Sequence, residues 1–189
     1  MSALPQAMTP HEQGEALVLE LRSTRDRFLS LLESVPESLR DIHPADGAWS
    51  IMDCAEHVCI VEELMSVSLE KRRATDAEPD LGKDAVIQKV ALDRSRKIAA
   101  PERAMPKGRY RSLAEAAEAF HSAREHNIVL IESLGEDLRR STCLHPMGVF
   151  DTYQFVRIMA SHPERHAAQM EEIMNSAAYR AAAHSQRVR

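Results

Sequence analysis

Hydrophobic and small side chains recur at alternating spacings of three and four residues in four stretches of the chain. This pattern indicates helices that each bury one face. In the first stretch the apolar face includes Leu17, Leu21 and Phe28, and a capping signal at Thr9-Pro10 precedes it. The later stretches are preceded by capping residues at Ser50, at Ser112, and at Asp151 or Thr152. The four predicted helices span about residues 10–35, 50–74, 112–134 and 151–176.

The segments between these helices contain residues that break helices. Residues 36–49 and 136–150 are rich in proline and glycine and are expected to be loops. The longest connection, 75–111, leaves room for a short helix near 83–94. We therefore predict an all-α fold, a four-helix bundle with a long crossover between helices 2 and 3.

The whole chain, residues 1–189, is expected to form a single domain. Its ends, at 1–8 and from about 176 to 189, are predicted to be loose, with a fraying helix as the alternative for the alanine-rich tail.

Composition narrows the functional classes. Aromatic residues make up 4% and charged residues 28%, with only six glycines, which favours helix over sheet. The net charge of -5, without a long basic run, argues against binding to nucleic acid or to an anionic membrane. There is no apolar run of 18 residues and no signal-peptide pattern, and the three cysteines form no CxxC pair. We therefore expect a cytoplasmic protein with no membrane partner.

Three of the nine histidines interrupt the apolar faces of the predicted helices. His162 and His166 are one helical turn apart, but roughly 0.4 such pairs are expected by chance in a chain of this composition, so their spacing alone is weak evidence. Their position is more informative, because both replace members of the apolar face of helix 4 and His57 does so in helix 2. A buried imidazole without a partner costs about 1–3 kcal/mol.

One divalent metal ion would satisfy all three rings at once. Imidazole suits zinc, nickel, copper or iron, and three protein ligands leave a coordination position open for water or substrate. We therefore predict a metal site at His57, His162 and His166. The alternative is that each is a core histidine paired with backbone or side-chain groups.

Other candidates have weaker support. Cys54 lies three residues before His57 and is either a fourth ligand or, as we expect, a small buried side chain. Glu56 and Glu62 either orient an imidazole or, by default, face solvent. His145 either lines the entrance of the site or belongs to a surface loop, the interpretation we favour. The remaining histidines are expected to be exposed or to lie in loops or at the ends: His11, His43, His121, His126 and His184.

Pro163 lies between the two histidines of helix 4. It removes a helical hydrogen bond and crowds the carbonyl of Met159. The helix is therefore expected to kink at 159–163, or to begin anew at Ser161, where Ser161 and Glu164 form a capping-box pattern.

Three segments resemble the DinB-like superfamily. They are Gly47–Val58, with Trp49-Ser50 before His57; Ser161–Met170, with a His-x-x-Arg-His-x-x-Gln-like run; and the loop His145–Gly148. The resemblance spans residues 10–175. It implies a four-helix bundle, a nickel or zinc site whose ligands match His57, His162 and His166, and often a homodimer. Pro163 departs from the commoner family pattern.

The resemblance also implies a range of activities. Some relatives are S-transferases that use a low-molecular-weight thiol, and hydrolase activity has been proposed for others. We therefore expect a metal-dependent enzyme that acts on a small electrophilic molecule, with a thiol cosubstrate or with water. The alternative is a non-catalytic, stress-related metal-binding protein, because no catalytic residue or general base stands out in the sequence.

Overall fold

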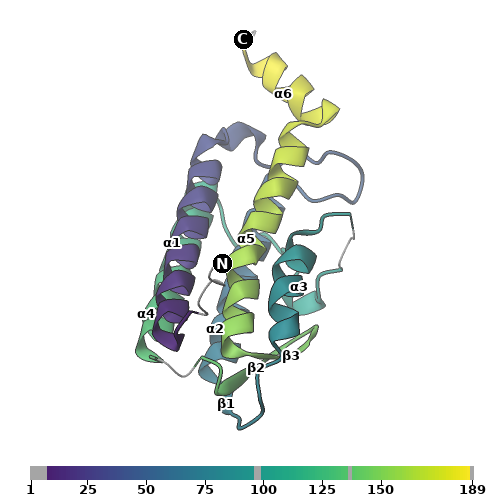
Figure 1. Cartoon of the computed structure of the whole chain (residues 1–189). Coiled ribbons are helices and arrows are strands. Elements are labelled where there is room, and N and C mark those ends of the chain that lie inside the picture. Colours follow the sequence, from purple (N-terminus) through teal and green to yellow (C-terminus); the bar gives the residue numbers. More distant parts are fainter. Residues whose placement is uncertain (1–7, 96–98, 136–137, 188–189) are drawn as a thin grey trace, which may run out of the picture.

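The computed structural model describes residues 8–95, 99–135 and 138–187. It confirms the four-helix bundle, which consists of the helices α1 (Pro10–Ser34), α2 (Ile51–Glu70), α4 (Leu113–Ser133) and α5 (Thr152–Met174) (Figure 1). The main packing contacts of α1 and of α2 are both with α4 and α5. In cross-section α1 and α2 therefore lie at opposite corners, and α2 and α5 share an interface.

The predicted helix starts are confirmed. Thr9 and Ser50 each form a capping box, with Glu12 and Asp53 respectively. The side chains of Ser112 and Asp151 each accept the backbone N–H three residues later. Each of these bonds satisfies an amide that has no partner within its helix.

A small sheet replaces part of the predicted loops. Strands β1 (Arg73–Ala74), β2 (Ser141–His145) and β3 (Gly148–Asp151) form an antiparallel sheet in that order. The prediction that 136–150 is only a loop is therefore wrong, and α2 ends at Glu70 rather than near Ala74 because β1 follows it. The Ser68 hydroxyl donates to the Leu144 carbonyl at 2.6 Å, which fixes the hairpin against α2.

The crossover contains the predicted short helix, α3 (Leu81–Leu92), which packs on the outside of α5 (Figure 1). Beyond α3, Arg94 donates to the carboxylate of Glu172 on α5 at 2.5 and 3.1 Å. The chain then passes through a short 3-10 helix, η2 (Glu102–Ala104), before α4 begins. A similar turn, η1 (Glu37–Leu39), lies between α1 and α2.

Of the two alternatives for the C-terminal tail, most of the segment follows the helical one and is not loose. Residues Ala177–Arg187 form a helix, α6, and Tyr179 is only 7% exposed against the core. The Ser176 hydroxyl oxygen accepts the Tyr179 N–H at 3.2 Å and so caps the helix. Alanine favours the helical backbone, and burial of the tyrosine ring anchors it. Residues 1–7 and 188–189, also expected to be loose, lie outside the described residues.

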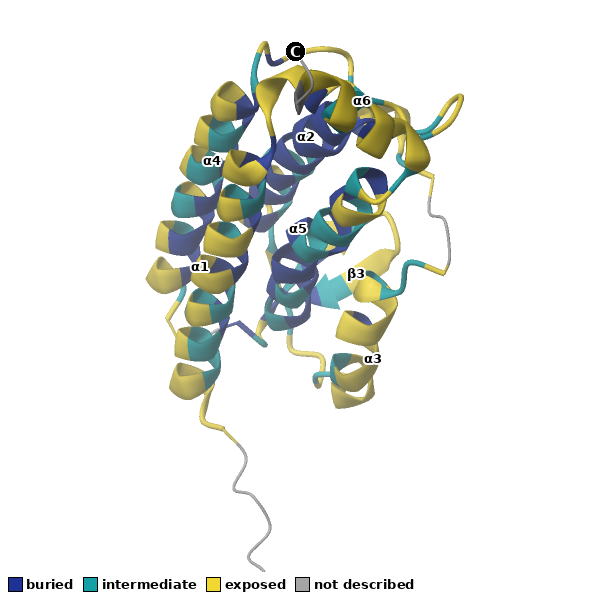
Figure 2. Ribbon diagram, turned by 90° about the horizontal axis from the view of Figure 1, so that it is seen from above, coloured by how far each residue is buried: buried dark blue, intermediate teal, exposed yellow. Residues whose placement is uncertain are grey.

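The buried residues of the four bundle helices face one another, whereas α3 and α6 are mostly exposed (Figure 2). The interior is not purely apolar, since Arg124 and Asn127 on α4 are fully buried. None of the described helices is long and apolar enough to cross a membrane.

Candidate metal centre

The bundle brings together the three histidines predicted as ligands. His57 comes from α2, and His162 and His166 come from α5, so the cluster lies at the interface of these two helices. One ring nitrogen from each lies within 4.8 Å of the others, and the ring centroids are 4.6–5.2 Å apart. His57 and His166 are 5% and 7% exposed, and His162 is partly exposed.

The His57 ring is oriented by the crossover. Its Nδ1 lies 2.7 Å from the carbonyl oxygen of Ala104, in η2. A carbonyl can only accept, so Nδ1 carries the proton and Nε2 keeps a free lone pair. Trp49, just before α2, lies over the same ring with a centroid distance of 4.8 Å and is also stacked on His166 at 6.2 Å.

The His166 ring is oriented by Gln169. Its Nδ1 lies 3.0 Å from Gln169 Oε1, and Arg94 donates to the same oxygen at 3.2 Å. Arginine cannot accept a hydrogen bond, so this atom is the amide oxygen and His166 Nδ1 is the donor. His166 therefore also has an unprotonated Nε2, the form in which imidazole binds a metal.

The third ring has a nitrogen without a partner. His162 Nδ1 is buried and forms no hydrogen bond with any described residue. An unpaired buried polar atom costs about 1–3 kcal/mol. Coordination of a metal through Nδ1 would remove that cost, and this atom therefore fits a metal site better than a fully paired core.

Burial keeps all three imidazoles neutral. It lowers the pKa of His57, lowers the pKa of His162 well below its usual range, and lowers the pKa of His166 to about 3. The neighbouring histidines, and Arg124 in the case of His162, disfavour a further positive charge. Neutral imidazole is the form required of a ligand, and an all-imidazole donor set suits zinc or nickel rather than magnesium or calcium.

The secondary candidates on α2 have other roles. Cys54 is fully buried and is not part of the histidine cluster, as we expected. Glu56 is 2% exposed and accepts the backbone N–H groups of residues 107–109 at 2.6–3.0 Å. Both alternatives for Glu56 were wrong, because it neither faces solvent nor bonds an imidazole. It fixes the crossover segment that holds His57.

Glu62 also differs from both predictions. It is 1% exposed and forms a buried ion pair with Arg124, at 2.7 and 2.9 Å. Glu62 also accepts a hydrogen bond from Asn127 Nδ2 at 2.8 Å. A buried carboxylate needs such partners to offset its desolvation.

Arg124 also explains how α5 tolerates Pro163. The helix runs unbroken from Thr152 to Met174, so the prediction that it begins anew at Ser161 is wrong. Pro163 has no N–H for the carbonyl of Met159, but Arg124 Nη2 donates to that oxygen at 3.2 Å. The guanidinium of Arg124 therefore replaces the missing donor at Met159, about one helical turn before His162.

His145 and His121 are less exposed than expected. His145 lies in β2, partly buried, with its ring 6.1 Å from that of Phe155. Its Nδ1 accepts the Met147 N–H at 3.2 Å, so the neutral ring carries its proton on Nε2. His145 is close enough to His162 to lower the pKa of that residue. His121 is partly buried, whereas His126 is exposed as predicted.

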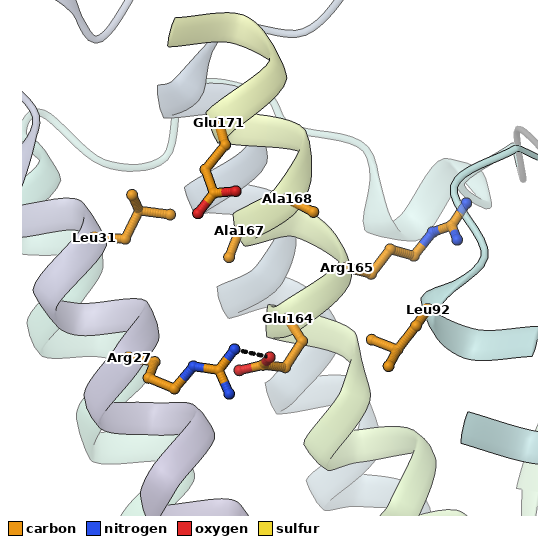
Figure 3. A pocket seen from close by; sticks show the side chains of 8 residues that line it. All are labelled: Arg27, Leu31, Leu92, Glu164, Arg165, Ala167, Ala168 and Glu171. Carbon is orange, nitrogen blue, oxygen red and sulfur yellow. Dashed lines mark ion pairs between the residues drawn. The ribbon is translucent and has the colours of Figure 1, made fainter. Parts of the chain in front are cut away.

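Two cavities lie beside the cluster rather than over it. The first, of about 300 Å³, lies on the outer side of α5, between α1 and the end of α3 (Figure 3). An ion pair between Arg27 and Glu164, at 2.5 Å, crosses one side of it. The second, of about 350 Å³, lies between α2 and residues 103–109 of the crossover. None of the three histidines lines either cavity.

Comparison with solved structures supports the fold. YfiT from Bacillus subtilis, described as a probable metal-dependent hydrolase with an unusual four-helix bundle topology, is 10% identical; the match covers 92% of each chain with a TM-score of 0.58. TT2238, described as a four-helix bundle protein, is 18% identical with a TM-score of 0.55, over 84% of this chain and 98% of that one. At these identities the similarity concerns the fold alone. No curated protein matches the sequence.

The family is established by the sequence itself. A profile of the DinB superfamily matches residues 20–170, which include the three histidines, Trp49 and the hairpin. The resemblance inferred from the short motifs is thereby confirmed over most of the chain. The chain belongs to the DinB superfamily.

Proposed function

We propose that the protein is a metal-dependent enzyme in which His57, His162 and His166 bind one zinc or nickel ion. The observation that carries the proposal is the protonation of the rings: His57 and His166 donate from Nδ1 to fixed oxygens and so present free Nε2 lone pairs. Core histidines that served only packing would have no reason to present unpaired nitrogens to one another.

The open coordination position gives the chemistry. A divalent ion held by three protein ligands supplies Lewis acidity, which lowers the pKa of a thiol or of water. The surrounding residues keep the site in the required state, since burial keeps the imidazoles neutral and Trp49 and Ala104 restrict the His57 ring. His145 contributes a further imidazole, with a proton on Nε2, near His162.

We propose that the substrate is a small electrophilic molecule, attacked either by a low-molecular-weight thiol or by water. The description of YfiT as a probable metal-dependent hydrolase supports the second reaction for that protein and makes it a candidate here. The resemblance to the DinB-like superfamily, which implies a nickel or zinc site at these histidines, also supports metal dependence.

The first test is metal content. Zinc and nickel are measured by elemental analysis in the wild type and in the His57→Ala, His162→Ala and His166→Ala variants. We expect about one ion per chain in the wild type and a large loss in each variant. His126→Ala, an exposed histidine on α4, is the matched control. Unchanged metal content in the three variants would refute the site.

The second test separates the reactions. The metal-loaded protein is assayed with a model electrophile and a panel of thiols, and with a model ester in water. Turnover that depends on a thiol supports the transferase, and turnover of the ester without thiol supports the hydrolase. No turnover in either assay would overturn the enzyme proposal.

A non-catalytic role has one observation in its favour. His57 and His166 are nearly inaccessible, and the cluster lines neither described cavity. On this alternative, metal raises the midpoint of thermal unfolding but no panel member is turned over.

A further inference from the structure

The cavity between α2 and the crossover adjoins the histidine cluster. On α2, Ile60 and Leu64 line it, one and two turns after His57. On the crossover, Arg103 and Met105 line it, on either side of Ala104. Since the Ala104 carbonyl accepts a hydrogen bond from His57 Nδ1 at 2.7 Å, the segment that lines the cavity also holds His57.

Both carboxylates of this cavity already accept hydrogen bonds from other residues of the protein. Glu56 accepts three backbone N–H groups from the loop at residues 107–109. Glu63 accepts Arg109 Nη1 at 2.7 Å. Neither acid is therefore free to neutralise another cation in the cavity.

Two positively charged side chains of the cavity form no ion pair with a described residue. Arg103 and Lys107 are exposed, and neither forms an ion pair in the part of the chain that the structure describes, although the protein as a whole carries a net charge of -5. Burial lowers the pKa of His145 in the hairpin, and the positive charge of Arg103 lowers it further. The lining of this cavity thus carries two positive charges that no described acidic residue neutralises.

The remaining lining is apolar. Ile60, Leu64 and Met105 form it, and Met105 is 37% exposed. Ligand sites commonly combine an apolar lining with a few placed polar groups, in volumes that begin near 300 Å³. The volume of about 350 Å³ therefore suits a small molecule with an apolar body and one charged end.

We propose that this cavity binds the anionic group of a reactant, with Arg103 and Lys107 as the binding residues, and so directs the uncharged end of the molecule toward the histidine cluster. The reactant is either the electrophile or the thiol. That the molecule reacts rests on the proposed function, but binding of the anion does not require the metal.

Binding is tested by calorimetry with three probes that share one skeleton: 4-phenylbutanoate, its neutral amide and 4-phenylbutylamine. We expect the carboxylate to bind about tenfold more tightly than the amide, and the amine least tightly. The affinity for the carboxylate should fall as sodium chloride is added, because the cations are exposed. Equal affinities for acid and amide would overturn the proposal.

Variants locate the binding. Arg103→Ala/Lys107→Ala should weaken carboxylate binding about tenfold, whereas Lys89→Ala, an exposed cation on α3 outside the cavity, should leave it unchanged. Circular dichroism verifies that each variant is folded. Unchanged affinity in the double variant would refute the assignment.

Two further arms separate this site from the metal. The carboxylate should bind equally well to metal-free protein and to His162→Ala; binding that requires the metal would show that the carboxylate is a metal ligand and would overturn the anion site. Glutathione is then added as a competitor. If glutathione displaces the probe, the site is assigned to the thiol. If it does not, the site is assigned to the electrophile. Both results uphold an anion-binding cavity.

Discussion

The orientations of His57 and His166 each depend on an oxygen that can only accept a hydrogen bond. The acceptor for His57 is a backbone carbonyl, which a substitution cannot remove. The acceptor for His166 is the side-chain oxygen of Gln169, which is held in place by Arg94. Gln169 is therefore the one position where a substitution can measure how much the hydrogen bond to a histidine Nδ1 contributes to metal binding.

Gln169→Leu should weaken zinc affinity about 10–100-fold, because His166 loses the acceptor that fixes its protonation and its angle. Gln169→Glu keeps an acceptor for both His166 and Arg94 and should bind zinc at least as well as the wild type. Competition with a chromophoric chelator measures both. Equal affinities in the two variants would show that the bond does not tune the site.

At the same scale, the sequence was informative about the histidines and misleading about the acids. His57, His162 and His166 could be predicted because an imidazole on an apolar helix face is visible in the spacing of one helix. Glu56 and Glu62 could not, because their partners are the amides of residues 107–109 and the guanidinium of Arg124, about 50 to 60 positions away. Arg124 follows Phe120 by four residues, on the apolar face of the predicted helix 112–134, and that position was the available signal of a buried charge.

Among the elements, α5 depends on a contact from another helix. Pro163 leaves the Met159 carbonyl without its helical donor, and Arg124 on α4 supplies a replacement. The helix that carries two of the three histidines is thus completed by a side chain of its neighbour.

A double-mutant cycle tests this replacement. Pro163→Ala restores the helical N–H, and Arg124→Lys keeps the positive charge beside Glu62 but removes the bond to Met159. We expect Pro163→Ala to stabilise the Arg124→Lys protein by about 1 kcal/mol more than it stabilises the wild type. Urea unfolding measures the four free energies. Additive effects would mean that Arg124 does not compensate for Pro163.

The elements also differ in how far sequence could predict them. The helices were found because their capping residues, such as Thr9 and Ser50, are local signals. The hairpin was missed because its strands are four or five residues long and pair only with each other and with β1. Helix α6 was predicted only as an alternative, because the burial of Tyr179 against η1 and the core, which anchors it, is a long-range contact that the sequence of the tail does not show.

For the whole molecule, the buried neutral histidines make stability depend on pH. Their folded pKa values lie below the unfolded value of about 6.5, so the unfolded chain binds protons that the folded chain does not. Stability is therefore greatest above about pH 6.5. It should fall as the pH decreases, by about 1.4 kcal/mol per pH unit for each histidine, until the folded pKa is reached.

This dependence is measured by urea unfolding of the metal-free protein between pH 7.5 and pH 5.5. His166→Gln should reduce the slope by the contribution of one histidine, because the pKa of His166 in the folded protein is about 3. Bound metal should steepen the dependence, since protons compete with it for the rings. A variant with the slope of the wild type would contradict the prediction.

The position of Trp49 has a practical consequence. It is the only indole in the chain, and its ring lies against two of the three histidines. Its fluorescence therefore reports on this one place in the molecule, without a label and without background from other tryptophans. Paramagnetic ions such as copper(II) or nickel(II) that bind beside it should quench the emission. Occupancy of the cluster could then be followed in real time in the unmodified protein.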